Sequence, residues 1–325
     1  MIVIIIVSWN VRDLLSACLD SLKQHAATTH PQVVVVVDNA SSDGTVDMIR
    51  TQYQDILVVA NPTNRGFTGG NNDGLMAAES RLTDSIPDKT YYFLLNPDTI
   101  VNAGALDAML GFADDNTDVG LVGPQLLYAD GSIQSSRRRF LDLTTAIFES
   151  TWLQSAAPAG LIDTFYMRGM PDNHICDVDW VYGAAMLVRR STYLQCGGLD
   201  EKTFFMYSEE MDWCKRIKST QIVDNDTGSP TWRVVYFPLA QITHLEAQSS
   251  TQVSTKRAIY FNTSKVRYMR KHHGIVTAGF LRCILLTLFL EQLIVESMKW
   301  LLGHKRSLRS QRIRTYVAVL KSGLV

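Results

Sequence analysis

The chain has 325 residues, of which 46% are hydrophobic and 19% are charged, so it can bury a sizeable core in one large domain or in one domain with an appendage. Its five cysteines form no C-x-x-C pair and no regular framework, which excludes a disulfide-stabilised scaffold. This spacing predicts ordinary thiols in a reduced, cytosolic compartment. The cysteines are Cys18, Cys176, Cys196, Cys214 and Cys283.

The formal net charge of −1 conceals two regions of opposite sign. Residues 1–246 contain 17 Lys and Arg against 30 Asp and Glu, whereas residues 247–325 contain 14 against 2. This split predicts an acidic body with a basic tail that meets an anionic surface.

The first predicted element is a buried strand. The apolar run Met1–Val7 is short, lacks a basic segment and continues directly into polar residues, which favours a strand of a parallel sheet over a signal peptide. Asp13–Gln24 then shows the apolar spacing of a helix. The valine run Val33–Val37 predicts a second strand, and the polar cluster Asp38–Thr45 ends it and caps a helix.

Strand and helix continue to alternate along the chain. Ile56–Ala60 predicts a third strand, the glycine-containing loop Asn61–Asn72 follows, and a helix is expected from Asp73 to about Arg81. Tyr91–Leu95 is an aromatic and aliphatic run that is typical of a buried strand. Four alternations indicate a doubly wound α/β layer.

The fourth strand ends at Asn96-Pro97-Asp98. Because proline cannot donate to a sheet ladder, the turn projects Asp98 past the sheet edge. Ligands bind at the carboxyl ends of strands in open α/β sheets, so Asp98 is placed to hold a divalent cation and, through it, a diphosphate. The alternative is a plain strand-ending turn, because Pro-Asp is common turn chemistry.

After this turn the pattern changes. Residues 140–175 are irregular, and the Asp-Gly pair within Leu126–Ile133 predicts a hairpin. Further strands are expected at Val119–Gly123, Trp180–Val188 and Trp232–Phe237.

A helix with an acidic first turn is expected after Ser208, which is suited to cap it. Glu209, Glu210 and Asp212 lie in this first turn, where acidic side chains also interact favourably with the helix dipole. The basic run Arg137–Arg139 has two interpretations, a solvated surface run or a contact to the diphosphate of an acceptor.

Several of these segments together resemble the family 2 glycosyltransferases and, within them, the rhamnosyltransferase-like branch. The matching motifs occur in the family's order over residues 1 to about 250. They are VSWN at 7–10, VDNASSDGT at 37–45, NRGFTGGNN at 64–72, LLNPDT at 94–99, GAAMLVRR at 183–190, GGLDEKTFFMYSEEMDWCKR at 197–216, and His244.

The resemblance implies an α/β fold of the GT-A nucleotide-sugar type, which is Rossmann-like with a mixed central sheet. The catalytic domain is expected at residues 1–250, and a helical, basic, amphipathic extension that associates with a membrane at residues 251–325. The resemblance also implies an inverting transfer that depends on Mg²⁺ or Mn²⁺. The cation neutralises charge on the diphosphate leaving group, and a base must reach the acceptor hydroxyl.

By the same resemblance, Asp98 and His244 are the metal ligands, Glu210 is the general base and Glu209 lies beside it in the catalytic pair. Hard cations keep few protein ligands, and an imidazole ligand favours Mn²⁺. The nucleotide-sugar site is expected to comprise Ser8, Asn10, Asp38, Asn64, Arg65, Asn71, Asn96 and Asp98.

The chain departs from the family pattern at two positions. Asn96 occupies the first position of the D-x-D-type motif, which is usual in this branch but removes one carboxylate. Glu210 stands where the family usually has Asp, so the base is one methylene longer. A lone histidine such as His244 can also be structural, and Asp43 is expected to cap its loop.

Other function classes are weaker on sequence. The order G-x-x-G-G at Gly66–Gly70 differs from the dehydrogenase fingerprint, and no P-loop motif occurs. A sugar nucleotidyltransferase would carry a glycine-rich basic loop after the first strand, where this chain has Ser8–Arg12. A catalytically inactive nucleotide-sugar-binding or scaffold protein at the membrane is the main alternative.

The tail predicts membrane association. Residues 275–302 are strongly apolar, but four charged side chains interrupt them, which favours an interfacial amphipathic helix over a spanning one. Basic residues follow closely and are each attracted to anionic lipid by roughly 1 kcal/mol. The alternative is a helix packed on protein. The basic residues are Lys305, Arg306, Arg309, Arg312 and Arg314.

These observations predict a cytosolic glycosyltransferase on the inner face of the cell membrane, active in cell-surface polysaccharide synthesis. Its expected partners are a nucleoside diphosphate sugar, with dTDP-L-rhamnose favoured, and a glycan or polyprenyl-linked acceptor. No nucleic-acid module accompanies the basic tail. A homo-oligomer is possible on sequence, and the acceptor and the linkage position stay open.

Overall fold

The computed structural model describes residues 1–81, 89–223, 231–245 and 254–325. The chain forms two compact units. The first comprises residues 1–140, 166–201 and 209–248, and the second comprises residues 141–165, 202–208 and 249–325.

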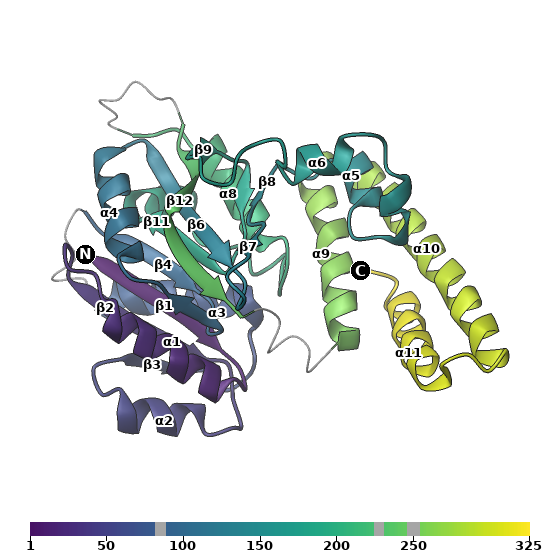
Figure 1. Cartoon of the computed structure of the whole chain (residues 1–325), viewed down its shortest axis with the longest axis horizontal. Coiled ribbons are helices and arrows are strands. Elements are labelled where there is room, and N and C mark those ends of the chain that lie inside the picture. Colours follow the sequence, from purple (N-terminus) through teal and green to yellow (C-terminus); the bar gives the residue numbers. More distant parts are fainter. Residues whose placement is uncertain (82–88, 224–230, 246–253) are drawn as a thin grey trace. The chain divides into compact units, whose positions relative to one another are not determined.

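The first unit is built on a mixed sheet (Figure 1). Across the described ranges, the main strand order is β3-β2-β1-β4-β11-β6-β12-β5, with β7 paired to β6 and β9 to β12, and β8 and β10 form a separate small sheet. The strands are β1 Ile2–Ser8, β2 Gln32–Asp38, β3 Leu57–Ala60, β4 Tyr91–Leu95, β5 Thr99–Val101, β6 Val119–Leu127, β7 Ile133–Gln134, β8 Arg137–Arg138, β9 Cys176–Asp177, β10 Trp180–Val181, β11 Ala185–Arg189 and β12 Arg233–His244.

The first four strands along the chain are parallel, as the alternating pattern predicts. Ser8 pairs with Asp38, and Ile6 pairs with Leu95, so β1, β2 and β4 end at the same edge. The strand β11 then runs antiparallel to both β4 and β6, which makes the sheet mixed. The predicted α/β fold with a mixed central sheet is therefore confirmed.

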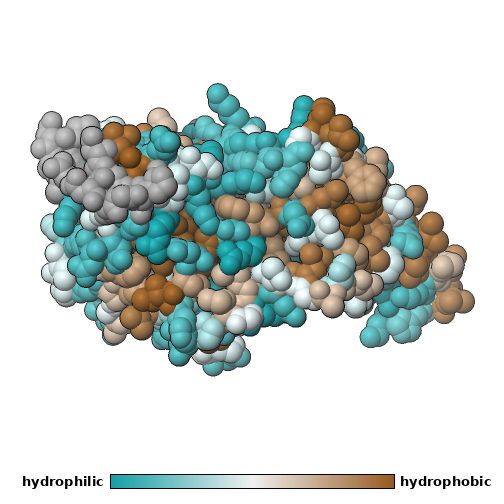
Figure 2. Space-filling view, turned by 90° about the horizontal axis from the view of Figure 1, so that it is seen from above, coloured by the Kyte–Doolittle hydropathy of each residue, from teal (hydrophilic) through white to brown (hydrophobic). Residues whose placement is uncertain are grey.

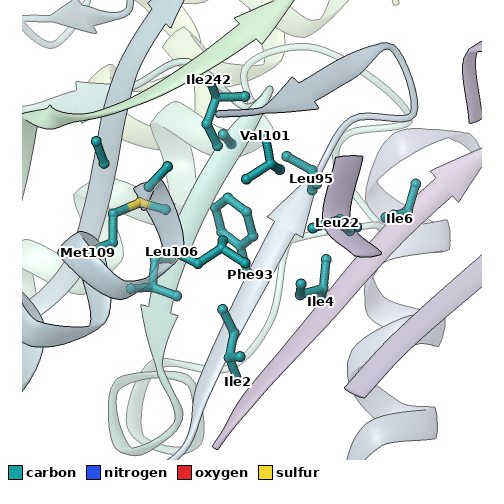
Figure 3. Packing of buried hydrophobic residues seen from close by; sticks show 14 of the residues in the cluster. Ile2, Ile4, Ile6, Leu22, Phe93, Leu95, Val101, Leu106, Met109 and Ile242 are labelled. Atoms are coloured by element: carbon teal, nitrogen blue, oxygen red, sulfur yellow. The ribbon is translucent and has the colours of Figure 1, made fainter. Parts of the chain in front are cut away.

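Helices cover both faces of this sheet. Alternate side chains of β1 enter two different cores, because successive residues of a strand point to opposite faces. On one face, Figure 3 shows side chains of β1, β4, β5 and β12 packed with those of α1 and α4. The helices of the first unit are α1 Arg12–Gln24, α2 Thr45–Gln52, α3 Gly66–Arg81, α4 Ala105–Asp115, α7 Arg190–Cys196 and α8 Glu209–Ser219.

The helix α3 begins at Gly66, so the predicted start at Asp73 is wrong. The Asn64 side chain accepts a hydrogen bond from the Gly66 amide at 2.8 Å and caps the helix. Gly70 and Gly74 lie against β1, where a Cβ atom would come within 2.6 Å of Val7 and 2.3 Å of Ile5. The glycines therefore allow the helix to approach the sheet closely, a need that helix propensity alone does not reveal.

Other predicted elements differ in extent. The expected strand Trp180–Val188 is two strands, β10 and β11, on either side of the small residues at 182–184. The expected hairpin is present, with β6 paired to β7 and Gly131 at φ +82° in the turn. Residues 140–175 are not wholly irregular. They contain the short helices α5 Leu143–Phe148, η1 Trp152–Ala156 and α6 Leu161–Phe165.

The second unit contains those short helices and three longer ones, α9 Ser254–His273, α10 Ile275–Leu301 and α11 Arg306–Ser322. Two ion pairs are buried inside it. Lys265 donates to the Glu149 carboxylate at 3.0 Å, and Arg309 donates to the Glu296 carboxylate at 2.6 Å. The second pair joins α10 to α11 and holds them as a helical hairpin.

We expect Gly74→Ala to lower the free energy of unfolding by about 1–3 kcal/mol, because the new methyl group overpacks the buried Ile5 side chain. Gly111→Ala in α4 is the matched control, since no described atom lies within 4 Å of its Cβ position, and we expect a gain of up to about 1 kcal/mol in helix propensity. Urea unfolding measures both changes. If Gly74→Ala stabilised the protein as much as Gly111→Ala does, the close approach of α3 to β1 would be contradicted.

Candidate functional site

Buried oxygen atoms without partners lie at the carboxyl ends of β1 and β2 and in the first turn of α3. Within the described ranges, Ser8 Oγ, Asp38 Oδ1 and Thr68 Oγ1 are buried and have no hydrogen-bond partner. The other Asp38 oxygen accepts a hydrogen bond from the Ser41 amide at 2.9 Å. Buried polar atoms are nearly always satisfied, so these three are suited to receive a ligand.

The loop residues around this edge are held by local contacts. Asn10 accepts a hydrogen bond from the Ser42 amide at 2.8 Å, which ties the segment after β1 to the segment after β2. Asp43 accepts hydrogen bonds from the Thr45 amide at 3.1 Å and from the Arg12 amide at 2.9 Å, as expected of a loop-capping residue.

Three other expected nucleotide-site residues have partners within the protein. Asn64 caps α3, and the Asn71 side chain donates to the Phe67 carbonyl at 2.9 Å. Arg65 forms ion pairs with Asp73 and with Glu201. These contacts give each residue a structural role, and their contact to a nucleotide stays a prediction.

The turn after β4 and the end of β12 bring two metal-binding residue types together. His244 pairs with Thr99 in the antiparallel register of β12 and β5, so it lies beside Asp98. Its Nε2 atom is 3.4 Å from Asp98 Oδ1 and 3.5 Å from the side-chain Nδ2 atom of Asn96. Both Asp98 and His244 are buried.

The environment of His244 fits a metal ligand. Its Nδ1 atom lies 2.9 Å from Gln134 Oε1, and a proton on Nδ1 leaves Nε2 with a free lone pair toward Asp98. Among the described residues, no group of three or more His, Cys, Asp and Glu side chains converges. A cation here would therefore take two protein ligands and complete its shell with other oxygen atoms.

The carboxylate of Glu210 lies in the first turn of α8 and is buried. Burial raises its pKa to about 7, although a backbone hydrogen bond and the positive charge of Arg138 oppose the shift. Its Oε2 atom has no partner in the described part of the chain. Gly183 lies beside this side chain, because a Cβ atom built on Gly183 would be 3.8 Å from the Cδ atom of Glu210 and 3.6 Å from the Phe67 ring. A carboxylate with a pKa near neutrality and an open oxygen can accept a proton at physiological pH.

The neighbouring acids have different surroundings. Glu209 is also buried, next to Glu210 in the helix. Asp212 is fully buried and forms an i,i+4 ion pair with Arg216 at 2.9 Å. Ser208 has a left-handed φ of 66°, whereas an N-cap residue normally has extended backbone, so its expected capping geometry is not observed.

The solvated interpretation of Arg137–Arg139 is wrong for two of the three residues, because Arg137 and Arg138 are buried. Arg137 donates to the Pro171 carbonyl at 3.0 Å and to Asp172 at 2.8 Å. Arg138 lies over the Tyr166 ring at 4.3 Å and acts electrostatically on Glu210.

Sequence reasoning missed Gln134 as a neighbour of the candidate site, and it offered Arg138 only as a contact to the acceptor diphosphate and not as a neighbour of Glu210. Both lie in or between the short strands β7 and β8, where a basic run and a lone glutamine are common surface features. Only the pairing of β7 to β6 and β8 to β10 brings them inward.

Comparison with solved structures identifies the fold. A mannosyltransferase from Pyrobaculum calidifontis, crystallised with GDP-mannose and Mn²⁺, superposes with a TM-score of 0.53 at 12% identity, covering 99% of this chain and 86% of that one. GalNAc-T7 with UDP, GalNAc and Mn²⁺ gives the same score and identity, covering 75% of this chain and 43% of that one. The chain therefore has the GT-A fold.

Sequence comparison identifies the family. The profile described as "Glycosyl transferase family 2" matches residues 3–170, which is more than half of the chain. The chain belongs to glycosyltransferase family 2 and is a transferase.

The chain is also similar to particular family members. It is 28% identical over 256 residues to the N-acetylglucosaminyl-diphospho-decaprenol L-rhamnosyltransferase of Mycobacterium tuberculosis, covering 76% of this chain and 78% of that protein. It is 27% identical to a low-salt glycan biosynthesis hexosyltransferase of Haloferax volcanii, covering 58% and 54%. The predicted resemblance to the rhamnosyltransferase-like branch is confirmed.

The raised pKa of Glu210 predicts a pH-dependent stability difference. The unfolded chain loses this proton near pH 4.5 and the folded chain near 7, so the folded state binds more protons between these values. The contribution of Glu210 to wild-type stability should therefore fall as the pH rises from about 4.5 to 7. Glu210→Gln, which lacks this titration, should become relatively more stable over that range by up to about 3 kcal/mol, with no further change above it.

Urea unfolding at a series of pH values measures this difference. Glu291→Gln, at an exposed position of α10, is the control for replacing a glutamate that is solvated in both states. A pH dependence of Glu210→Gln that parallels the wild type would contradict the raised pKa.

Proposed function

We propose that this chain is an inverting, metal-dependent family 2 transferase that moves a hexose from a nucleoside diphosphate donor to a polyprenyl-linked or glycan acceptor. The observation that carries the proposal is the convergence of Asp98 and His244 at the carboxyl end of β4, with Nε2 directed at the carboxylate. This pair matches the oxygen and imidazole ligands that Mn²⁺ accepts, and Mg²⁺ would rely more on Asp98 and the donor diphosphate.

The donor site follows the edge formed by β1, β2 and β4. The free oxygen of Asp38 accepts a hydrogen bond from the nucleoside, and the Ser8 hydroxyl donates or accepts one. Asn10 holds the loop that borders this site. Asn64, Arg65 and Asn71 shape the start of α3 beside the nucleotide. Bound between Asp98, His244 and the diphosphate, a divalent cation would neutralise charge on the leaving group.

Glu210 supplies the base, with Glu209 next to it. The acceptor hydroxyl oxygen forms a bond to the anomeric carbon as the bond from that carbon to the diphosphate oxygen breaks, and the hydroxyl proton moves to Glu210. Because attack and departure occur on opposite faces of the sugar, the configuration inverts without a covalent enzyme intermediate. The raised pKa of Glu210 makes it a stronger proton acceptor than a solvated carboxylate.

The favoured donor is dTDP-L-rhamnose and the favoured acceptor is a GlcNAc-diphospho-polyprenol. The support is the similarity to the mycobacterial protein, whose name specifies an L-rhamnosyl group and a diphospho-decaprenol acceptor. The alignment covers more than three quarters of both chains.

We propose that the catalytic domain ends near residue 250 and that the C-terminal extension after it associates with the cytoplasmic face of the membrane. The helix α10 is 27 residues long and apolar enough to cross a bilayer by length and composition, and 17% of its most apolar window is buried. Its exposed apolar residues include Val276, Phe280, Leu290, Ile294 and Leu301. Figure 2 shows hydrophobic side chains at the right-hand end, where α10 and α11 lie in Figure 1.

This surface supports an interfacial position. The residues that follow, Lys305 and Arg306, are exposed and basic, and they suit anionic headgroups beside inserted leucines. Such an arrangement would keep the enzyme near a lipid-linked acceptor. Homo-oligomer formation stays a prediction.

A thermal-shift panel tests the nucleotide and metal site. We expect one of UDP, dTDP and GDP, with dTDP favoured, to raise the melting temperature only when Mn²⁺ or Mg²⁺ is present, because ligands that bind the folded state stabilise it by about 2.7 kcal/mol at a hundredfold excess over Kd. Asp98→Ala should abolish this shift. Asp130→Ala, in the exposed hairpin turn, is the control and should keep it.

Two outcomes would count against the proposal. A nucleotide shift that needs no cation, or that survives in Asp98→Ala, would remove the proposed metal site. The absence of a shift with all three nucleotides would favour a scaffold protein over an active transferase.

Vesicle sedimentation tests the membrane proposal. Leu301→Glu combined with Leu302→Glu should weaken binding to phosphatidylglycerol-containing vesicles by more than about tenfold, because each inserted leucine contributes roughly 1.5–3 kcal/mol. Leu239→Glu, at an exposed leucine of β12, is the matched control. Equal binding to pure phosphatidylcholine vesicles would contradict the role assigned to the basic residues.

A further inference from the structure

A short segment of the first unit, from Gln134 in β7 to Arg138 in β8, connects the candidate metal ligand to the candidate base. At its start, Gln134 Oε1 lies 2.9 Å from Nδ1 of His244. At its end, the positive charge of Arg138 opposes the rise that burial causes in the pKa of Glu210. Both ends of the segment therefore act on groups to which the proposed function assigns a role.

The even-numbered residues of this segment share one face. Gln134, Ser136 and Arg138 are buried, whereas Ser135 is exposed. Successive side chains of an extended strand point to opposite faces, so the three buried side chains lie on the same side. Arg137 is buried differently, because its guanidinium lies over a ring of β12, 4.9 Å from the ring centroid.

The neighbouring strand shows which side this is. The ladder that pairs Arg138 of β8 with Trp180 of β10 continues, since the Tyr182 amide donates to the Ser136 carbonyl at 2.8 Å. Tyr182 therefore lies opposite Ser136, and directly opposed side chains of an antiparallel pair lie on the same face. The centroid of the Tyr182 ring is 6.0 Å from that of His244. Ser136 thus faces the same side as a ring that lies against the candidate metal ligand.

The Ser136 hydroxyl is not used by the described part of the protein. Ser136 is 3% exposed, and its Oγ atom has no hydrogen-bond partner within the described ranges. Buried hydroxyl groups nearly always have a partner, and each can both donate and accept a hydrogen bond. Another hydroxyl group is therefore a well-matched ligand for this atom.

We propose that Ser136 is a specificity-determining residue whose hydroxyl binds a ring hydroxyl of the donor hexose. The inference rests on the proposed function, in which the cation held by Asp98 and His244 binds the donor diphosphate and Glu210 deprotonates the acceptor. The anomeric carbon is bonded to that diphosphate and is attacked by that acceptor, so the hexose must lie between the cation and the base. Ser136 lies on the segment that connects these two groups.

Calorimetric titration of the full chain with dTDP and with dTDP-L-rhamnose, each in the presence of Mn²⁺, tests this role. We expect Ser136→Ala to raise the Kd of dTDP-L-rhamnose by about 3-fold to 10-fold, as for the loss of one neutral hydrogen bond. The Kd of dTDP should change less than about twofold, because dTDP carries no sugar at this position.

Thr192→Val is the matched control. The Thr192 Oγ1 atom is also buried and has no partner among the described residues, but it lies beside Gly120, near the start of β6. We expect this variant to bind both ligands as the wild type does. Equal weakening in the two variants would overturn the assignment.

Deoxy analogues identify the hydroxyl group that Ser136 binds. Among the 2-deoxy, 3-deoxy and 4-deoxy forms of dTDP-L-rhamnose, one should bind the wild type about 3-fold to 10-fold more weakly than the parent compound. The same analogue should lose little affinity in Ser136→Ala, because the two changes remove the two partners of one hydrogen bond and are not additive. Equal losses in both proteins for all three analogues would contradict the contact.

Urea unfolding without ligand provides an independent readout. Deleting a buried hydroxyl that has no protein partner should not lower the free energy of unfolding of Ser136→Ala. A clear loss of stability would assign the hydroxyl to the protein's own structure and overturn the inference.

The remaining outcomes separate this inference from the proposed function. A wild type that binds dTDP-L-rhamnose together with a Ser136→Ala variant of equal affinity would refute the role of Ser136 alone. An effect confined to the KM of a GlcNAc-diphospho-polyprenol acceptor would also refute it. A wild type that binds neither dTDP nor dTDP-L-rhamnose would overturn the proposed donor, and the inference with it.

Discussion

The antiparallel pairing of β12 with β5 is the constraint on which the candidate site depends. The residues Thr99 and His244 are 145 positions apart in the sequence numbering and become neighbours only through this register. The pairing continues past the strands, because the Leu245 amide donates to the Asp98 carbonyl at 2.9 Å. A slip of one residue would send the imidazole to the opposite face of the sheet and separate it from the carboxylate.

Much of the first unit follows from short-range sequence signals. Apolar runs that end in Ser8, Asp38 and Asn96 predict parallel strands with polar residues at one edge, and the structure has this arrangement. The buried state of Asp98 and Glu210 could not be predicted in the same way, because it depends on the packing of segments distant in sequence. The family resemblance supplied the expected roles of these residues, which periodicity alone does not indicate.

The places where sequence reasoning failed share a physical cause. The start of α3 was misjudged because glycine has low helix propensity, whereas here it permits contact between helix and strand. The burial of Arg137 and Arg138 was missed because charged residues are usually exposed. In the structure, backbone carbonyls and aromatic rings replace water around them.

The second unit is assembled from three separate stretches of chain, and this has a consequence for how the protein can be divided. Segments 141–165 and 202–208 are connected at both ends to the first unit, yet α5 packs on α10 and Phe205 packs on Tyr260 of α9. A shortened chain that lacks α9 to α11 would remove Lys271 from the face of the buried Phe204 ring and Lys265 from the Glu149 carboxylate. The helical region is therefore a co-folding partner, and exchange of this region between relatives requires the two inner segments to change with it.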